Sequence, residues 1–431
     1  MGHPVAHEAD YYTGQADAYI DDILSDRIPA CEFVKLACER QKADLTDPAA
    51  GYTFDPARAS RVCKFIELLP HIKGKWAGQP IKLEGWQVFI LTTVFGWVDE
   101  NGYRRYKTAY TEVPRKNAKS TISSGVALYL MAADGEAGAE VYSAATTRDQ
   151  ARIVWQDAKR MVDKTPGLKR KFGVQTAAHS IHVDDTASWF RTLSRDQGGN
   201  LDGLNVYGAV IDELHAHKTR DVWDVIETGT GSREDPLMWG ITTAGFNRAG
   251  ICYEQRAYVI RVLQGVADDP EYFGIIYTID EGDDWADESS WIKANPNWGV
   301  SVKPDDIRRK ARKAMEMAAA QNNFLTKHLN TWVNADTAWM DMRAWDRCAQ
   351  PELSIERFEG KPCWIALDLA SKIDIASIAL LFKDGERLVC FTRNYLPEDA
   401  AEEGKNSQYG GWAREGRLIT TPGNVTDYSI I

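Results

Sequence analysis

The sequence lacks long hydrophobic runs, paired cysteines and internal repeats, and each absence removes a class of protein. No apolar stretch approaches the roughly 18–20 residues of a membrane-spanning helix, and the polar, acidic segment Met1–Tyr12 is unlike a signal peptide. The seven cysteines are scattered, without a C-x-x-C pair or a Cys/His cluster of zinc spacing. We therefore expect no membrane span, disulfide framework, zinc site or repeat array, and mostly buried, reduced thiols in a cytosolic protein.

An excess of positive charge is also missing. The formal net charge is −11, so the surface is not uniformly basic, and any nucleic-acid contact must come from local basic patches or from a channel formed by several copies. The contents of 44% hydrophobic and 26% charged residues are those of an ordinary soluble globular protein. At 431 residues, the chain is long enough for two or three domains.

Predicted strands and helices alternate from about residue 105 to 245, which favours a mostly parallel, doubly wound α/β sheet. The predicted strands are 108–113, 139–145, 189–194, 204–211 and 237–243, and the helices lie near 120–133, 148–164 and 219–229. Residues 15–70 look helical, and 260–345 are less regular, with one helix that begins at Lys303-Pro304. Three short strands follow at 363–368, 375–382 and 387–392, the last two joined by a turn at 383–386.

These changes of pattern predict four regions. They are a helical N-terminal region at 1–75, an α/β domain at 76–260, a linker or lid subdomain at 261–355 and a third domain at 361–431.

Residues 107–121 have the layout of a phosphate-binding P-loop. A β-prone run ends at Val113-Pro114, and a polar turn leads through Lys119-Ser120-Thr121 into a helix. Lys119 would reach the β- and γ-phosphates of a nucleotide, and the Ser120 hydroxyl would bind Mg²⁺. The consensus has glycines where this chain has Val113 and Ala118, so a plain loop remains an alternative.

Two further strand ends carry polar groups that ATP hydrolysis requires. The apolar run 206–211 leads into Asp212 and Glu213, which would hold Mg²⁺ and polarise the attacking water, respectively. A third strand ends in Thr242-Thr243, whose hydroxyls could sense the γ-phosphate. Taken without the neighbouring motifs, a strand of β-branched residues that simply turns at glycine is the preferred explanation. Upstream, Gln87 could contact an adenine edge, or simply be a helix residue beside Trp86.

The order of these motifs resembles the large terminase subunit, the DNA-packaging motor of tailed double-stranded-DNA phages. The similarity runs from about residue 80 to the end and includes Trp86-Gln87, the loop 113–121, 210–215, 242–245, 329–332, 365–371 and 421–423. It implies a P-loop ATPase domain of the RecA-like (ASCE) type, in which the first glycine is commonly replaced and an arginine is present. The implied ATP-binding residues are Gln87, Arg115, Lys116, Asn117, Ala118, Lys119, Ser120 and Thr121, with Arg115 near the phosphates and Thr242-Thr243 as the coupling motif.

The resemblance also implies an RNase H-like nuclease in the last segment. Such a nuclease would hold two divalent metal ions, Mg²⁺ or Mn²⁺, with Asp368 as the bridging carboxylate and Asp374 as a weaker candidate. Asp374 could also be a loop residue that caps the next strand. Because the family's other metal carboxylates come from later strands, we expect an incomplete nuclease domain in this chain and no cleavage activity.

The function implied is an ATP-hydrolysing motor that translocates viral double-stranded DNA into a procapsid and cuts concatemeric DNA. The implied partners are DNA, the portal protein of the procapsid, the small terminase subunit and further copies of the chain in a ring, pentameric on the portal. The implied location is the host cytoplasm and, transiently, the procapsid. Arg148 and Arg233 are candidate arginine fingers. A helicase-like translocase and an ATP-dependent assembly switch are the alternatives.

Overall fold

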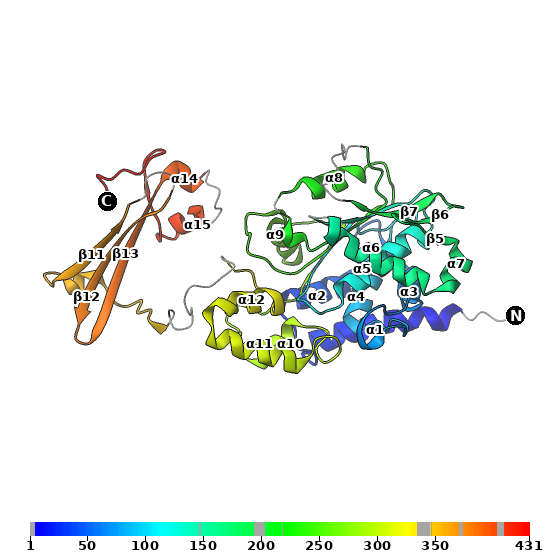
Figure 1. The fold of residues 1–431 in the computed structure, drawn as a ribbon, viewed down its shortest axis with the longest axis horizontal. Helices are drawn as coiled ribbons and strands as arrows, with labels where there is room; N and C mark the ends of the chain where they lie inside the picture. The colour runs from blue at the N-terminus through cyan, green and yellow to red at the C-terminus, as the bar shows by residue number, and fades with distance from the viewer. Residues whose placement is uncertain are drawn as a thin grey trace. The chain divides into compact units, whose positions relative to one another are not determined.

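The computed structural model describes residues 5–145, 148–193, 203–217, 219–333, 345, 347–369, 374–402 and 409–431. The chain divides into two compact units, Met1–Trp339 and Met340–Ile431 (Figure 1). The division lies upstream of the domain junction that the sequence predicts between residues 351 and 361. The first three predicted regions belong to the first unit, apart from residues 340–355.

The first unit contains an eight-stranded sheet with the strand order β10-β3-β9-β8-β4-β7-β6-β5. Neighbouring strands are parallel from β10 to β7, and β6 and β5 are antiparallel additions at one edge. The strands are β3 (Thr108–Glu112), β4 (Glu140–Ala144), β5 (Val174–Thr176), β6 (Ile181–Val183), β7 (Ser188–Leu193), β8 (Gly208–Asp212), β9 (Leu237–Thr242) and β10 (Tyr272–Ile276). The predicted doubly wound sheet is confirmed.

Helices bury this sheet, which is why its central strands are continuous apolar runs rather than alternating ones. Every residue of β8, β9 and β10 is buried. Helix α5 packs against β4 and β8, α6 against β7, and α9 against β10. The helices that follow strands are α5 (Lys119–Ala132), α6 (Arg148–Asp163), α7 (Pro166–Phe172), α8 (Asp221–Gly229) and α9 (Ile251–Leu263).

The predicted helical N-terminal region consists of α1 (Val5–Leu24), α2 (Glu32–Thr46) and α3 (Pro56–Glu67), followed by α4 (Gly85–Gly96). A two-stranded ribbon joins β1 (Thr53–Phe54) to β2 (Trp97–Val98). Gly125 brings α5 close to α3, because a Cβ atom there would lie 2.9 Å from the Ile66 side chain. The N-terminal helices and the sheet therefore share one hydrophobic core.

Three helices form a small subdomain within the first unit, where the sequence predicted one. They are α10 (Glu288–Ala294), α11 (Pro304–Glu316) and α12 (Ala318–His328). Their own core includes Trp291, Ile307, Ala311 and Phe324. The predicted helix corresponds to α11, whose buried residues recur at helical spacing. Helix α12 was missed because its alanines and asparagines give no comparable period.

The second unit is a four-stranded sheet in the order β11-β12-β13-β14. The strands are β11 (Cys363–Asp368), β12 (Ala376–Asp384), β13 (Arg387–Pro397) and β14 (Ile419–Thr421), with short helices α14 (Glu398–Glu402) and α15 (Tyr409–Arg414). The first three strands correspond to the three that the sequence predicts and pair antiparallel, and β14 adds in parallel to β13. Gly385, with φ of +67°, makes the predicted turn between β12 and β13.

The cysteines and the helices can be compared with the expectations about thiols and membrane spans. Four cysteines, all in the first unit, are buried and unpaired, and the other three, in the second unit, are exposed. Among the helices of the described ranges, none combines the length and apolarity needed to cross a bilayer.

Candidate active site

The P-loop keeps the shape of its glycine-containing counterpart without the glycines. It leaves the C-terminal end of β3 and enters α5 at Lys119. Lys116 and Ala118 have φ of +75° and +59°, in the left-handed region that glycine adopts without steric cost. For non-glycine residues this conformation costs about 1–2 kcal/mol each, so surrounding contacts must compensate.

Asn117 supplies those contacts from the middle of the loop. It is fully buried, and its Nδ2 donates to Pro114 O at 3.1 Å and to Asn295 Oδ1 at 2.9 Å. Its Oδ1 accepts from the Asn297 backbone N–H at 3.0 Å. Ser301 Oγ donates to Lys116 O at 2.6 Å. The segment 295–301, between α10 and α11, therefore supports the loop.

Lys119 lies inside the loop and already contacts the predicted coupling motif. Its Nζ donates to Val113 O at 3.0 Å, to Pro114 O at 3.3 Å and to Thr243 Oγ1 at 2.7 Å. Burial lowers the pKa of Lys119, and the carboxylates of Glu213 and Asp212 act in the opposite direction. The structure thus brings together three strand ends that lie far apart in the sequence.

The two acidic residues follow β8, beside the start of α5. Asp212 is 6% exposed, and its Oδ2 lies 3.5 Å from Ser120 Oγ. Burial and the neighbouring Glu213 charge raise the pKa of Asp212 to about 7. A buried carboxylate beside a second one and a hydroxyl is the hard-oxygen arrangement that suits Mg²⁺. Ser120 and Asp212 therefore fit the predicted metal-binding role.

Glu213 has the opposite electrostatic environment. Burial alone would raise its pKa, but His215 and the charges of Lys119 and Arg115 outweigh burial and lower the pKa to about 2. The backbone of Glu213 is left-handed, with φ of +52°. Its carboxylate is thus held ionised, as activation of an attacking water requires.

Two cavities are lined in part by residues of the P-loop. One, of about 330 Å³, is lined by Gln87, Trp76, Thr121 and Ser301 among others, so Gln87 faces a space beside the loop. Gln87 Oε1 also accepts from the Glu84 N–H at 3.0 Å, within a capping box at the start of α4. The other cavity, of about 220 Å³, is lined by Ala145, Gln150, Ile153, Ala216 and four residues near the catalytic centre, which are Arg115, Asp212, Glu213 and His215.

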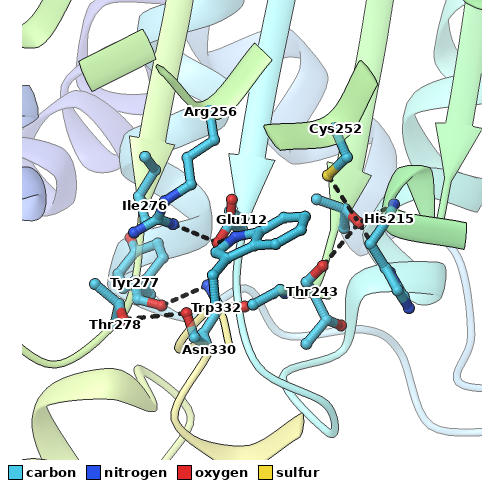
Figure 2. Close-up of polar contacts among 12 residues, drawn as sticks. Glu112, His215, Thr243, Cys252, Arg256, Ile276, Tyr277, Thr278, Asn330 and Trp332 are labelled. Atoms are coloured by element: carbon cyan, nitrogen blue, oxygen red, sulfur yellow. Dashed lines mark hydrogen bonds and ion pairs between the residues drawn. The ribbon is translucent and has the colours of Figure 1, made fainter. Parts of the chain in front are cut away.

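A buried polar network that was not predicted anchors the end of β3. The fully buried Glu112 accepts from Arg256 Nη1 at 2.5 Å, Trp332 Nε1 at 3.1 Å and Tyr110 Oη at 2.7 Å. Figure 2 shows Arg256 and Trp332 converging on this carboxylate. Because paired buried charges fix the elements that carry them, Glu112 ties α9 and the segment after α12 to the strand before the P-loop.

Asn330 ties the same segment to the coupling motif. Its Oδ1 accepts from the Ala244 N–H at 2.6 Å, directly after Thr242-Thr243, and its Nδ2 donates to Tyr277 O at 2.8 Å (Figure 2). A carboxylate inside an apolar strand was the one sequence signal for this network, because its other members lie far along the chain.

The candidate arginine fingers have different surroundings. Arg148 begins α6, but its side chain lies outside the described residues. Arg233 forms an ion pair with Glu136 at 2.7 Å and donates to Gly138 O at 2.7 Å. These contacts precede β4 and β9, at the edge of the sheet opposite the P-loop. As an arginine finger, Arg233 would have to leave both partners.

The predicted nuclease residues are not assembled in the same way. Asp368 ends β11 and is exposed, while Asp374 accepts a hydrogen bond from the Ile375 N–H at 2.8 Å, as a capping residue does. Residues 370–373, between them, lie outside the described part. Within the ranges that the structure describes, no group of three or more His, Cys, Asp or Glu side chains is placed to hold a metal ion.

A doubly wound sheet with a P-loop at the C-terminal end of one strand and an Asp-Glu pair at another defines the P-loop ATPase class. Comparison with protein families is more specific. A family model described as the terminase large subunit ATPase domain matches residues 85–261, and one described as the terminase large subunit endonuclease domain matches 266–420. Together they cover most of the chain, which belongs to the terminase large subunit family. The endonuclease match begins well upstream of residue 361, where the sequence predicted that domain.

Two relatives and one solved structure show how far the similarity extends. The chain is 38% identical over 271 residues to Protein YmfN of Escherichia coli K12, covering 60% of this chain and 59% of YmfN. It is 27% identical over 386 residues to the large terminase subunit of Enterobacteria phage HK97, covering 87% and 73%. The crystal structure of the HK97 large terminase is similar in fold, with a TM-score of 0.55 and 24% identity over 86% of this chain and 76% of that one.

Proposed function

We propose that this protein is an ATP-hydrolysing motor that translocates viral double-stranded DNA into a procapsid. One observation carries the ATPase part of this proposal. Lys119, Ser120, Asp212 and Glu213 converge at the C-terminal ends of the parallel strands of one sheet, beside two cavities. This is the edge where α/β sheets bind ligands.

In this proposal, the phosphates of ATP lie against the backbone N–H groups of the loop and the start of α5. Lys119 supplies positive charge to the β- and γ-phosphates, with Arg115 nearby. Ser120 and Asp212 would hold Mg²⁺, which neutralises developing charge on the phosphate oxygens. Glu213 orients and polarises the attacking water. Gln87, from its cavity, contacts the adenine.

The hydrogen bond from Lys119 to Thr243 suggests how hydrolysis is coupled to movement. Lys119 is held by the two loop carbonyls and by Thr243 at 2.7 Å. Phosphate oxygens would compete for the same ammonium group, and Thr243 would lose a charged partner when they bind. Because Thr243 is followed by Ala244, which Asn330 holds, the change would reach the segment after α12.

The partners that we propose are those of a packaging machine: double-stranded DNA, a portal-bearing procapsid, a small terminase subunit and further copies of this chain in a ring, pentameric on the portal. Arg148 or Arg233 would complete a neighbour's site. We also propose that Asp368 and Asp374 belong to a two-metal nuclease that uses Mg²⁺ or Mn²⁺. All of this would take place in the cytoplasm of an infected or prophage-carrying cell.

Steady-state ATP hydrolysis by the parent and by Glu213→Gln tests the proposed ATPase. The parent should turn over ATP in the presence of Mg²⁺, and Glu213→Gln should bind ATP with similar affinity but lose hydrolysis. A Lys42→Ala variant, which removes an exposed ion pair with Asp21, is the control and should keep parental turnover. A parent that binds ATP without hydrolysing it would instead favour the assembly switch.

A further inference from the structure

Three polar groups meet at His215, which the proposed chemistry leaves without a role. The imidazole Nδ1 lies 3.1 Å from Glu213 Oε2 and 3.1 Å from Thr242 Oγ1. On the other side of the ring, Nε2 lies 3.1 Å from Lys327 Nζ. The side chain is 12% exposed, so few solvent contacts compete with these partners.

Lys327 determines where the imidazole carries its proton. An ammonium group can only donate, so Nε2 must accept from Lys327 and the neutral ring carries its hydrogen on Nδ1. Burial lowers the pKa of His215 despite the opposing effect of Glu213, which is consistent with this neutral form. The Nδ1 contact with Thr242 Oγ1 has hydrogen-bond geometry, whereas Glu213 Oε2, at the same distance from Nδ1, is buried without a hydrogen-bond partner among the described residues.

Thr242 is already committed to backbone groups. Its Oγ1 accepts from the His215 backbone N–H at 3.0 Å and donates to Thr243 O at 3.1 Å. Because the Thr242 hydroxyl donates its proton to Thr243 O, its oxygen faces His215 as an acceptor. The imidazole thus lies between Thr242 of the coupling motif and the Glu213 carboxylate that activates water, and its single N–H can bond to one of them at a time.

The cation that sets the ring's tautomer comes from the small helical subdomain. Lys327 lies in the last turn of α12, and its backbone carbonyl accepts from the Arg115 N–H at 2.9 Å. One residue of α12 therefore contacts both the P-loop and His215. Displacement of α12 from the sheet would remove both contacts together.

We propose that His215 is a positioning residue for hydrolysis, held by Lys327 so that its Nδ1–H can turn from Thr242 to the adjacent, unsatisfied Glu213 oxygen and orient that carboxylate. Catalysis would then depend on whether α12 is seated against the P-loop. The inference rests on the proposed ATPase, because it assigns Glu213 the role of activating water. It adds a chain of contacts, from Lys327 through His215 to Glu213, that connects the small helical subdomain with the attacking water.

Four variants test the inference by separating turnover from nucleotide binding. His215→Ala should lower the single-turnover hydrolysis rate by about 10- to 100-fold while the Kd for Mg·ATP changes less than about 3-fold. His215→Asn should recover much of the loss, because its amide places an N–H where Nδ1 stands. Lys327→Met should lower the rate less, and Lys327→Arg should restore it.

A double variant tests whether the two residues act through one path. Asparagine at 215 has no acceptor at the Nε2 position, so adding Lys327→Met to His215→Asn should cost little more than the single change. Lys310→Met is the matched control: it removes a half-buried lysine of α11 that pairs with Asp306, and it should leave both constants unchanged.

The outcomes separate this inference from the proposed function. Parental hydrolysis by His215→Ala would overturn the positioning role and leave the ATPase intact. Equal losses in His215→Ala and His215→Asn, together with lowered thermal stability, would also overturn it, because they indicate a packing role. A parent that hydrolyses no ATP would overturn the proposed function itself.

Discussion

Replacing Asn117 by alanine should weaken ATP binding strongly, because this buried side chain holds the P-loop in its strained conformation. The substitution removes three hydrogen bonds, to Pro114 O, Asn295 Oδ1 and the Asn297 N–H. At about 1 kcal/mol each, they total about 3 kcal/mol, before any cost of leaving the buried partners unsatisfied. If the ATP-binding conformation of the P-loop is destabilised by this amount, the affinity for ATP falls by about 100-fold.

Smaller changes in the same loop should give graded effects. Ser301→Ala removes two hydrogen bonds, one donated to Lys116 O and one accepted from Asn297 Nδ2, and at about 1 kcal/mol each it should weaken ATP binding by about 30-fold. Ala118→Gly relieves a left-handed φ and should recover about 1 kcal/mol in the Asn117→Ala background. The ranking of these variants by ATP affinity tests the role of the loop contacts more directly than the affinity of any single variant.

Fluorescence titration with a labelled ATP analogue measures these affinities, and thermal unfolding monitors the fold. We expect Asn117→Ala to lower both affinity and Tm, with partial recovery of affinity in the double variant. If Asn117→Ala bound ATP within about twofold of the parent, an effect within about 0.4 kcal/mol, the segment 295–301 would have no role in shaping the loop.

Three further predictions concern the same site. Lys119→Ala should abolish nucleotide binding, as measured by titration, and normal affinity would refute the P-loop assignment. In nucleotide-free protein without Mg²⁺, Asp212 should make unfolding easier as pH rises from about 4 to 7: its folded pKa of about 7 exceeds its ordinary value, so the folded state binds more protons over this range. The difference in Tm between the parent and Asp212→Asn should change with pH accordingly; a constant difference would show that burial does not raise this pKa. Glu112→Gln should lower the free energy of unfolding by about 3–5 kcal/mol, because it leaves Arg256 buried without its charged partner; an unchanged denaturant midpoint would show that the ion pair is not needed.

Much of the fold could be predicted because its signals are local. Strand β3, the loop and α5 form one continuous stretch, and the apolar run of β8 ends in Asp212-Glu213 within a few residues. The absence of the two consensus glycines weakened only the match to the P-loop motif. The backbone still turns through the left-handed region at Ala118, at a cost that Asn117 offsets.

The contacts that support the site could not be predicted in the same way. Asn117 meets Asn297, Glu112 meets Trp332, and His215 meets Lys327 across more than 100 residues of sequence. No periodicity or spacing encodes such pairs. Strand β10 was missed for a related reason, because its partner β3 is distant in sequence and its short run is flanked by irregular segments.

The most direct test of the packaging proposal compares ATP hydrolysis with and without procapsids that carry a portal, in the presence of double-stranded DNA. A packaging motor should hydrolyse ATP faster when portal-bearing procapsids are added, and Lys119→Ala should show no response. Procapsids that lack the portal are the control and should give no stimulation. An ATPase rate that is the same with and without the portal would contradict the proposal that this chain drives DNA into a procapsid.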